Sequence, residues 1–227
     1  MADKSTLIGN DGAVYLGERG SAIAGGGADD LDTLAGNGDV GSGAGIYQIA
    51  AMAATGSVFS WSDAEVGDYF WDDGTLVLAT DDEVYALPTV EDATIKGWQI
   101  SPSKSKVDTG VFKDKQKTYR MGKADMSGSV TGLMTADDFT LSDRFVERMT
   151  TASDGSKTKN AIKDDPFYVV LWLKHKAKSG EKRLAMVGRV EAENFEFSVQ
   201  EDSADEFTCN IAPTTGDKIM MIEVQTS

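Results

Sequence analysis

The sequence predicts a mainly β protein with antiparallel sheets and one α-helix. Short apolar runs that often alternate with polar residues, separated by turn residues, recur along most of the 227 residues. The composition, with 24 glycines and only 4 prolines, is typical of many turns. An apolar stripe with helical spacing occurs near residues 140–152. A chain of this length can form one large domain or two small ones, and we predict two, residues 1–92 and 93–227.

The predicted N-terminal domain combines a glycine-rich arm with a small β unit. After a strand at 13–16, the segment from Gly17 to Gly45 has little periodicity and is expected to be a long loop or arm. No Lys-Ser or Lys-Thr pair follows its glycines, so it does not match a phosphate-binding loop. Residues 46–87 hold several strand-like runs, and Asp73-Gly74 is expected to form a tight hairpin turn. Pro88 to Asp92 marks the boundary.

The predicted C-terminal domain begins with two strands, 95–100 and 126–134. The second strand has one small, hydroxylic face and several glycines, which weaken a strand unless another backbone or subunit approaches closely. A helix is expected at 140–152, with a cap from Thr140 and an apolar stripe formed by Leu141, Phe145, Val146 and Met149. Its residues Arg144, Glu147 and Arg148 are expected to face solvent.

The last third is predicted to contain only strands and turns. The run 166–178 is apolar on both faces, as expected of a central strand. It is followed by strands within 182–201, at 207–211 and at 219–224. The single cysteine, Cys209, is expected to be a core residue, and it excludes an internal disulfide.

The charge is distributed very unevenly. Residues 1–92 carry two basic and 17 acidic side chains, which accounts for the whole formal charge of −15. A segment at 103–123, predicted to be a loop, holds seven basic residues against two acids. It is expected to meet an acidic surface, so that copies of the chain associate head to tail. The candidate contact residues are Lys104, Lys106, Lys113, Lys115, Lys117, Tyr119, Arg120 and Lys123.

Enzyme, metal and membrane functions are not indicated. The only histidine, His175, lies between two lysines with no nucleophile or acid placed near it by sequence. One histidine and one cysteine cannot complete a zinc site, so no cofactor or metal is predicted. The acidic pairs Asp29-Asp30 and Asp72-Asp73 and the run Asp81-Asp82-Glu83 lack the spacing of a calcium loop and are expected to be solvated turns, although calcium binding by an acidic turn is left open. There is no secretory signal and no run long enough to span a bilayer.

The segment from Trp98 to Gly132 resembles the tail tube (major tail) proteins of long-tailed bacteriophages. The matching features are ATIKGWQIS, the loop with Val107-Asp108-Thr109, the run KDKQKTYRMGKAD and the strand GSVTGLM, followed by a helix and hairpins. The resemblance covers residues 93–227. It implies a β-sandwich or partly closed barrel with one flanking helix, and a structural virion protein rather than an enzyme.

The resemblance also implies partners. Six copies would form a ring by joining sheets, rings would stack into a tube, and DNA would pass through without specific binding. Tail tip and tail terminator proteins would be further partners. The protein would be made and assembled in the host cytoplasm and would end in the virion tail. The acidic residues 1–92 depart from the family pattern, and they fit either a lumen that repels DNA or a solvated outer module.

Two other functions fit the sequence. One is a carbohydrate-binding or receptor-binding β-sandwich at a virion tip, for which Trp61, Tyr69, Phe70 and Trp71 are the only aromatic cluster. The other is a tail terminator or head-to-tail joining protein, which forms a single ring. Stacked rings, single rings and monomers in electron micrographs distinguish the three.

Overall fold

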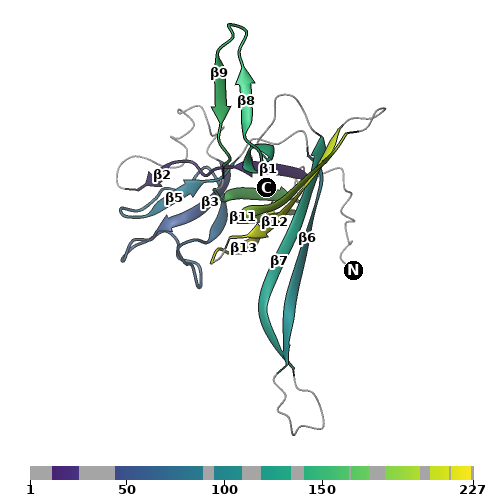
Figure 1. Ribbon diagram of the computed structural model, residues 1–227. Helices are drawn as coiled ribbons and strands as arrows, with labels where there is room; N and C mark the ends of the chain where they lie inside the picture. Colours follow the sequence, from purple (N-terminus) through teal and green to yellow (C-terminus); the bar gives the residue numbers. More distant parts are fainter. Residues whose placement is uncertain are drawn as a thin grey trace, which may run out of the picture. The chain divides into compact units, whose positions relative to one another are not determined.

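The computed structural model describes residues 12–25, 44–88, 95–108, 119–133, 141–163, 165–173, 182–199, 205–214 and 216–225. These residues form two compact units (Figure 1). Unit 1 comprises 1–93, 165–190 and 214–227, and unit 2 comprises 94–164 and 191–213. The predicted division into domains 1–92 and 93–227 stays a prediction, because contacts do not measure which parts of a chain fold alone.

Unit 1 contains two antiparallel sheets. In the first, β1 (Ala13–Gly17) pairs with β10 (Phe167–Trp172), which pairs with β11 (Lys182–Ser198), and β13 (Ile219–Gln225) also pairs with β11. The second has the order β2-β5-β3-β4, from β2 (Ala22–Ala24), β5 (Glu83–Ala86), β3 (Ala44–Ala51) and β4 (Tyr69–Asp73). Every residue of β10 is buried, as predicted for a central strand.

Two apolar clusters hold unit 1 together. The larger joins N-terminal residues such as Tyr15, Ile46 and Tyr69 to Val170 and Val187, which come from β10 and β11. The other lies within the second sheet, around Tyr47, Ile49 and Val84, and includes Phe59 and Leu78 from loops. The N-terminal segment therefore completes its core with strands from the C-terminal third.

Unit 2 is built on a long hairpin, β6 (Ile95–Asp108) and β7 (Tyr119–Leu133), which Figure 1 shows as two adjacent ribbons. On its other side β7 pairs with β12 (Glu206–Pro213). A separate hairpin joins β8 (Arg148–Thr151) to β9 (Lys157–Asn160). Val130 and Cys209 are completely buried in this unit, as expected for Cys209, and burial raises the pKa of its thiol to about 11 despite the opposing effect of Arg144.

The predicted flanking helix is wrong. In the described part of the segment, 141–163, only Ser142–Arg144 form a short 3₁₀ turn, η3, and the chain then enters β8. Of the predicted stripe, Leu141 is buried and Phe145 stacks on Phe195, whereas Val146 and Met149 are exposed. Arg144, predicted to face solvent, is buried.

A competing hairpin explains this difference. The β-branched residues Thr150, Thr151 and Thr158 favour strands, and Gly155, with φ +81°, allows the tight turn that pairs β8 with β9. The cap residue predicted for the helix, Thr140, lies outside the described residues.

Two loop predictions also need correction. Residues 103–108 and 119–123 are not loop but strand, because β6 and β7 continue to pair as far as Asp108 and Tyr119. At Asp73-Gly74 the chain does turn, and Gly74 has φ +93°. The residues after this turn form no partner strand for β4, which pairs with β3 instead. The sheets are antiparallel, as predicted, but the described strands form no closed barrel.

No helix among the described residues is long and apolar enough to cross a membrane.

Candidate assembly surfaces

The β6–β7 hairpin has unpaired edges over much of its length. β12 pairs with β7 only from Gly128 to Leu133, whereas β6 pairs with β7 as far as Asp108 and Tyr119. Within the described residues, no strand pairs with the outer edge of β6 or with β7 before Gly128. Unpaired backbone N–H and C=O groups at such edges can bind a strand of another molecule.

Five of the eight predicted contact residues lie in the β6–β7 hairpin, and the other three lie outside the described residues. Lys104 and Lys106 lie in β6, opposite Ala124 and Met121 of β7. Tyr119, Arg120 and Lys123 lie in β7. Lys113, Lys115 and Lys117 lie outside the described residues, as does His175. The structure therefore places five of the eight on one ribbon, and their role in contacts between copies stays a prediction.

A polar hollow of about 350 Å³ lies on the paired half of the hairpin. Its lining includes Ser101 on β6, Ser127 and Ser129 on β7, Glu193 on β11 and Asn210 on β12. At Gly128, a Cβ atom would lie 2.8 Å from the Gln99 carbonyl oxygen and 2.6 Å from Ile100 Cδ1. The glycines in this strand predicted that another backbone approaches it closely. At Gly128 that backbone belongs to β6 of the same chain.

A second surface is acidic and belongs to unit 1. Residues 44–88 hold eight acidic side chains, of which Asp68 and Asp82 are buried, and no lysine or arginine. Some of these acids are structural: Asp72 accepts hydrogen bonds from the backbone N–H groups of Gly74 and Leu76, and Asp73 accepts one from the Thr75 hydroxyl. The hydrogen bonds from Thr75 keep the pKa of Asp73 below its usual value. Both carboxylates therefore cap the turn after β4, as expected of turn residues.

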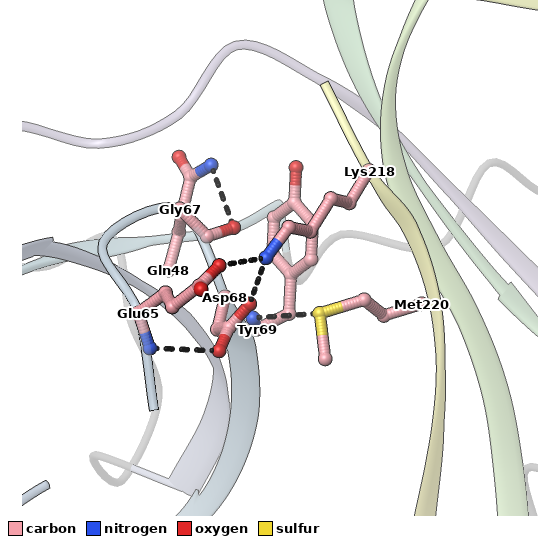
Figure 2. A network of polar contacts seen from close by, with 7 residues as sticks. All are labelled: Gln48, Glu65, Gly67, Asp68, Tyr69, Lys218 and Met220. Atoms are coloured by element: carbon pink, nitrogen blue, oxygen red, sulfur yellow. Dashed lines mark hydrogen bonds and ion pairs between the residues drawn. The ribbon is translucent and has the colours of Figure 1, made fainter. Parts of the chain in front are cut away.

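One cation from a distant part of the chain binds this acidic surface. Figure 2 shows Lys218 Nζ between the carboxylates of Glu65, at 2.6 Å, and Asp68, at 3.0 Å. Asp68 also accepts a hydrogen bond from the Glu65 backbone N–H, and Tyr69 N–H donates to Met220 Sδ. The hydrogen bond to Glu65 and then the one to Asp68 raise the pKa of Lys218. The network ties the 65–69 segment to the start of β13.

We expect Lys218→Met to lower the melting temperature of the protein by a few degrees. The substitution keeps most of the aliphatic stem but removes the ammonium group, leaving the buried Asp68 carboxylate without its cation. The effect is limited because Lys218 is half exposed. Thermal unfolding followed by circular dichroism measures it, with Lys182→Met as the control, since Lys182 pairs with Glu223 on an exposed surface. An equal loss in both variants contradicts the role of the network.

An open groove of about 850 Å³ lies between β4 and β13 in unit 1. Its lining includes three carboxylates, Asp72, Asp73 and Glu223, together with Trp71 and Met221. Arg183 also lines the groove, but its guanidinium carbon lies 4.7 Å from the centre of the Trp71 ring and 5.4 Å from that of Trp172. Aromatic rings thus hold the guanidinium of Arg183, and the lining carries more acidic than basic side chains.

The aromatic residues considered for sugar binding are mostly packed. Tyr69 is 4% exposed and belongs to the larger core cluster. Phe70 stacks on Tyr47 and contacts the rings of Phe59 and Trp61. Only Trp61, 44% exposed, presents a substantial surface. The four residues therefore do not form one open aromatic platform.

Sequence reasoning missed one structural carboxylate. Asp82, predicted to lie in a solvated turn, is completely buried, and it accepts hydrogen bonds from the backbone N–H groups of Ala53 at 2.8 Å and Val58 at 2.9 Å. The only signal in the sequence was its position one residue before a strand. Among the described residues, no group of three or more His, Cys, Asp or Glu side chains could hold a metal ion.

Comparisons with known proteins gave structural matches alone. No protein-family model and no curated protein matches the chain. The tail of an empty gene transfer agent particle, with C6 symmetry, matches at 12% identity and TM-score 0.36, over 58% of this chain and 85% of that one. The virion of a native gene transfer agent particle also matches at 12% identity and TM-score 0.36, over 58% of this chain and 88% of that one.

The SPP1 tail tube matches at 13% identity and TM-score 0.37, over 80% of this chain and 77% of that one. These are structures of a virion, a tail and a tail tube. TM-scores this low do not establish a shared fold, so the function has to be inferred from the sequence and strand edges of the chain itself.

Proposed function

We propose that the chain is a tail tube subunit, a structural virion protein that self-assembles into rings, most simply hexamers, which stack into a tube for the passage of DNA. The observation that carries the proposal is the β6–β7 hairpin, in which, within the described residues, the outer edge of β6 and the edge of β7 before Gly128 are unpaired. Long unpaired edges cause aggregation unless another strand covers them, and a closed ring of identical subunits covers them specifically.

Two further features support assembly by copies of one chain. The acidic residues 1–92 and the basic segment 103–123 supply complementary charges on every copy. The sequence of residues 93–227 resembles that of tail tube proteins. In this proposal the partners are further copies of the chain, with tail tip and tail terminator proteins at the two ends, and the protein resides in the virion tail.

The basic segment provides the test. We expect the triple substitution Lys113→Glu, Lys115→Glu and Lys117→Glu to block ring stacking without unfolding the chain, because the contact with an acidic surface becomes repulsive. Negative-stain electron microscopy and sedimentation measure tube formation, and circular dichroism checks the fold. Replacement of the same lysines by arginine keeps the charge and should keep the tubes.

The outcomes separate the role of the segment from the function as a whole. Tubes of normal length from the triple glutamate variant contradict the role of the segment. A wild-type chain that stays monomeric at high concentration contradicts assembly altogether, and single rings that never stack indicate a tail terminator or joining protein instead.

A further inference from the structure

The β8–β9 hairpin is an exposed, basic element of unit 2. Its strands pair only with each other in the described structure, and the residues from Met149 to Lys159 are all exposed. An isolated two-stranded hairpin is marginally stable in water, so a hairpin without cover on either face gains stability from a partner.

The foot of this hairpin is held in place. Arg148 donates from Nε and Nη2 to the two carboxylate oxygens of Asp143, each at 2.9 Å, and the Lys163 N–H donates to the Asp143 carbonyl. At the tip, Ala152 N–H bonds to the Ser156 carbonyl and Gly155 N–H bonds to the Ala152 carbonyl. The element is therefore preorganised at both ends, which lowers the entropic cost of binding.

One face of the hairpin combines charge with an apolar group. In the register of the two strands, Met149 lies opposite Lys159, and Thr151 lies opposite Lys157. Residues two apart share a face, so Met149, Lys157 and Lys159 point to the same side. Met149 is 59% exposed. Lys159 forms an ion pair with one acid, Glu147. Because the face also carries Lys157, its net charge stays positive.

We infer that this face docks into the groove between β4 and β13 of a second copy of the chain. The groove offers the matching chemistry, with the carboxylates of Asp73 and Glu223 for the two lysines and Trp71 and Met221 for the methionine. Glu223 already pairs with Lys182 of its own chain, and this ion pair is exposed, so an incoming lysine can share or replace it. Met221 is 60% exposed, so both sides of the contact present an uncovered methionine. β4 is also an edge strand in the described four-stranded sheet, and an edge strand can pair with an incoming strand, here beyond Tyr69, whose N–H donates to Met220.

A second copy is the occupant because each chain carries both halves of the contact. A head-to-tail contact of this kind repeats from copy to copy and either closes into a ring or continues as a stack. The inference rests on the proposed self-assembly and adds to it a surface separate from the β6–β7 hairpin and the basic segment 103–123.

Charge reversal on each half gives the test. The hairpin variant carries Lys157→Glu and Lys159→Glu, and the groove variant carries Asp73→Lys and Glu223→Lys. Asp72 is left unchanged because its carboxylate accepts the backbone N–H groups of both Gly74 and Leu76 in the turn after β4. Asp73 accepts hydrogen bonds only from the neighbouring Thr75, so its replacement disturbs the turn less. We expect each variant alone to self-associate at least about tenfold more weakly than wild type in sedimentation velocity at low salt, because like charges then face each other across the contact. Circular dichroism checks that both variants fold.

Mixing distinguishes a contact between chains from one within a chain. An equimolar mixture of the two variants restores association, since the acidic hairpin of one now meets the basic groove of the other. A single chain with all four substitutions associates as well. If association returns in the four-substitution chain but not in the mixture, the two halves do not meet between different chains, and the inference is wrong.

The remaining outcomes separate this inference from the proposed function. If the hairpin variant associates as tightly as wild type, the docking surface is wrong while self-assembly stands. If wild type itself does not associate at any accessible concentration, both the proposed self-assembly and the proposed docking surface are wrong.

Discussion

Replacing Trp172 by alanine is expected to lower the free energy of unfolding by about 3–5 kcal/mol, the usual cost of deleting a buried aromatic side chain. Trp172 lies in the central strand β10 and is 2% exposed. Its ring packs edge-on against Trp71 at 5.9 Å between ring centres, and the Arg183 guanidinium lies close to both rings. The substitution therefore opens a cavity and removes one of the two aromatic faces that hold a cation.

Chemical denaturation at a protein concentration too low for assembly measures this loss. Trp172→Phe keeps an aromatic ring in the core and should lose much less. Trp61→Ala is the matched control, because Trp61 is 44% exposed and its deletion leaves no enclosed cavity. Equal losses for Trp61→Ala and Trp172→Ala contradict the placement of Trp172 in the core of unit 1.

Replacing Asp82 by asparagine is expected to lower the free energy of unfolding by about 2–3 kcal/mol at neutral pH. The two carboxylate oxygens accept from different donors, Oδ1 from Ala53 N–H and Oδ2 from Val58 N–H. An asparagine can accept only one of these hydrogen bonds, and its amide NH₂ then faces the other N–H. Asp81→Asn is the matched control, because its neighbour Asp81 is exposed and its positive φ of 71° is tolerated by asparagine.

Acid should remove the stabilisation by the Asp82 carboxylate in the wild-type protein. Burial raises the pKa of Asp82, but hydrogen bonds from Ala53 and Val58 and further ones from Ser57 and Ala79 outweigh it, so the pKa lies below its usual value. A group with a lowered pKa stabilises the fold above the usual aspartate pKa of about 3.9 and loses this effect as the pH falls through the pKa of the folded protein. The difference in stability between wild type and Asp82→Asn should therefore shrink in acid. A constant difference from pH 6 to about pH 2.5 contradicts the lowered pKa.

These two residues show where sequence reasoning succeeded and where it did not. The run 166–178 is apolar on both faces, which predicted a central buried strand, and β10 is fully buried. Locally, only its position one residue before a strand distinguished Asp82 from Asp81. Asp81 is exposed, whereas the loop at 53–58 folds over Asp82, a contact between residues 24 to 29 positions apart.

The helix predicted at 140–152 failed for a related reason. Its apolar spacing was correct locally, but Phe145 packs against Phe195 and the backbone from Arg148 pairs with β9. Because hairpin pairing and a stacked ring from a distant strand compete with the helix, tertiary context overrode local preference. The extent of β6 and β7 was likewise underestimated, because the polar and basic residues at 103–108 and 119–123 were expected to form a loop, whereas their backbones pair as strands.

The sequence by itself determined the antiparallel β class, the buried strand β10, the buried Cys209 and the separation of acidic from basic segments, because periodicity, composition and charge are local properties. Only the tertiary structure decided that the N-terminal segment shares a core with β10, β11 and β13, that Asp82 anchors a loop, and that the β6–β7 hairpin has unpaired edges. Those features depend on which distant segments come into contact. The free energy of such contacts comes from burial and strand pairing between segments, which a short stretch of sequence does not reveal.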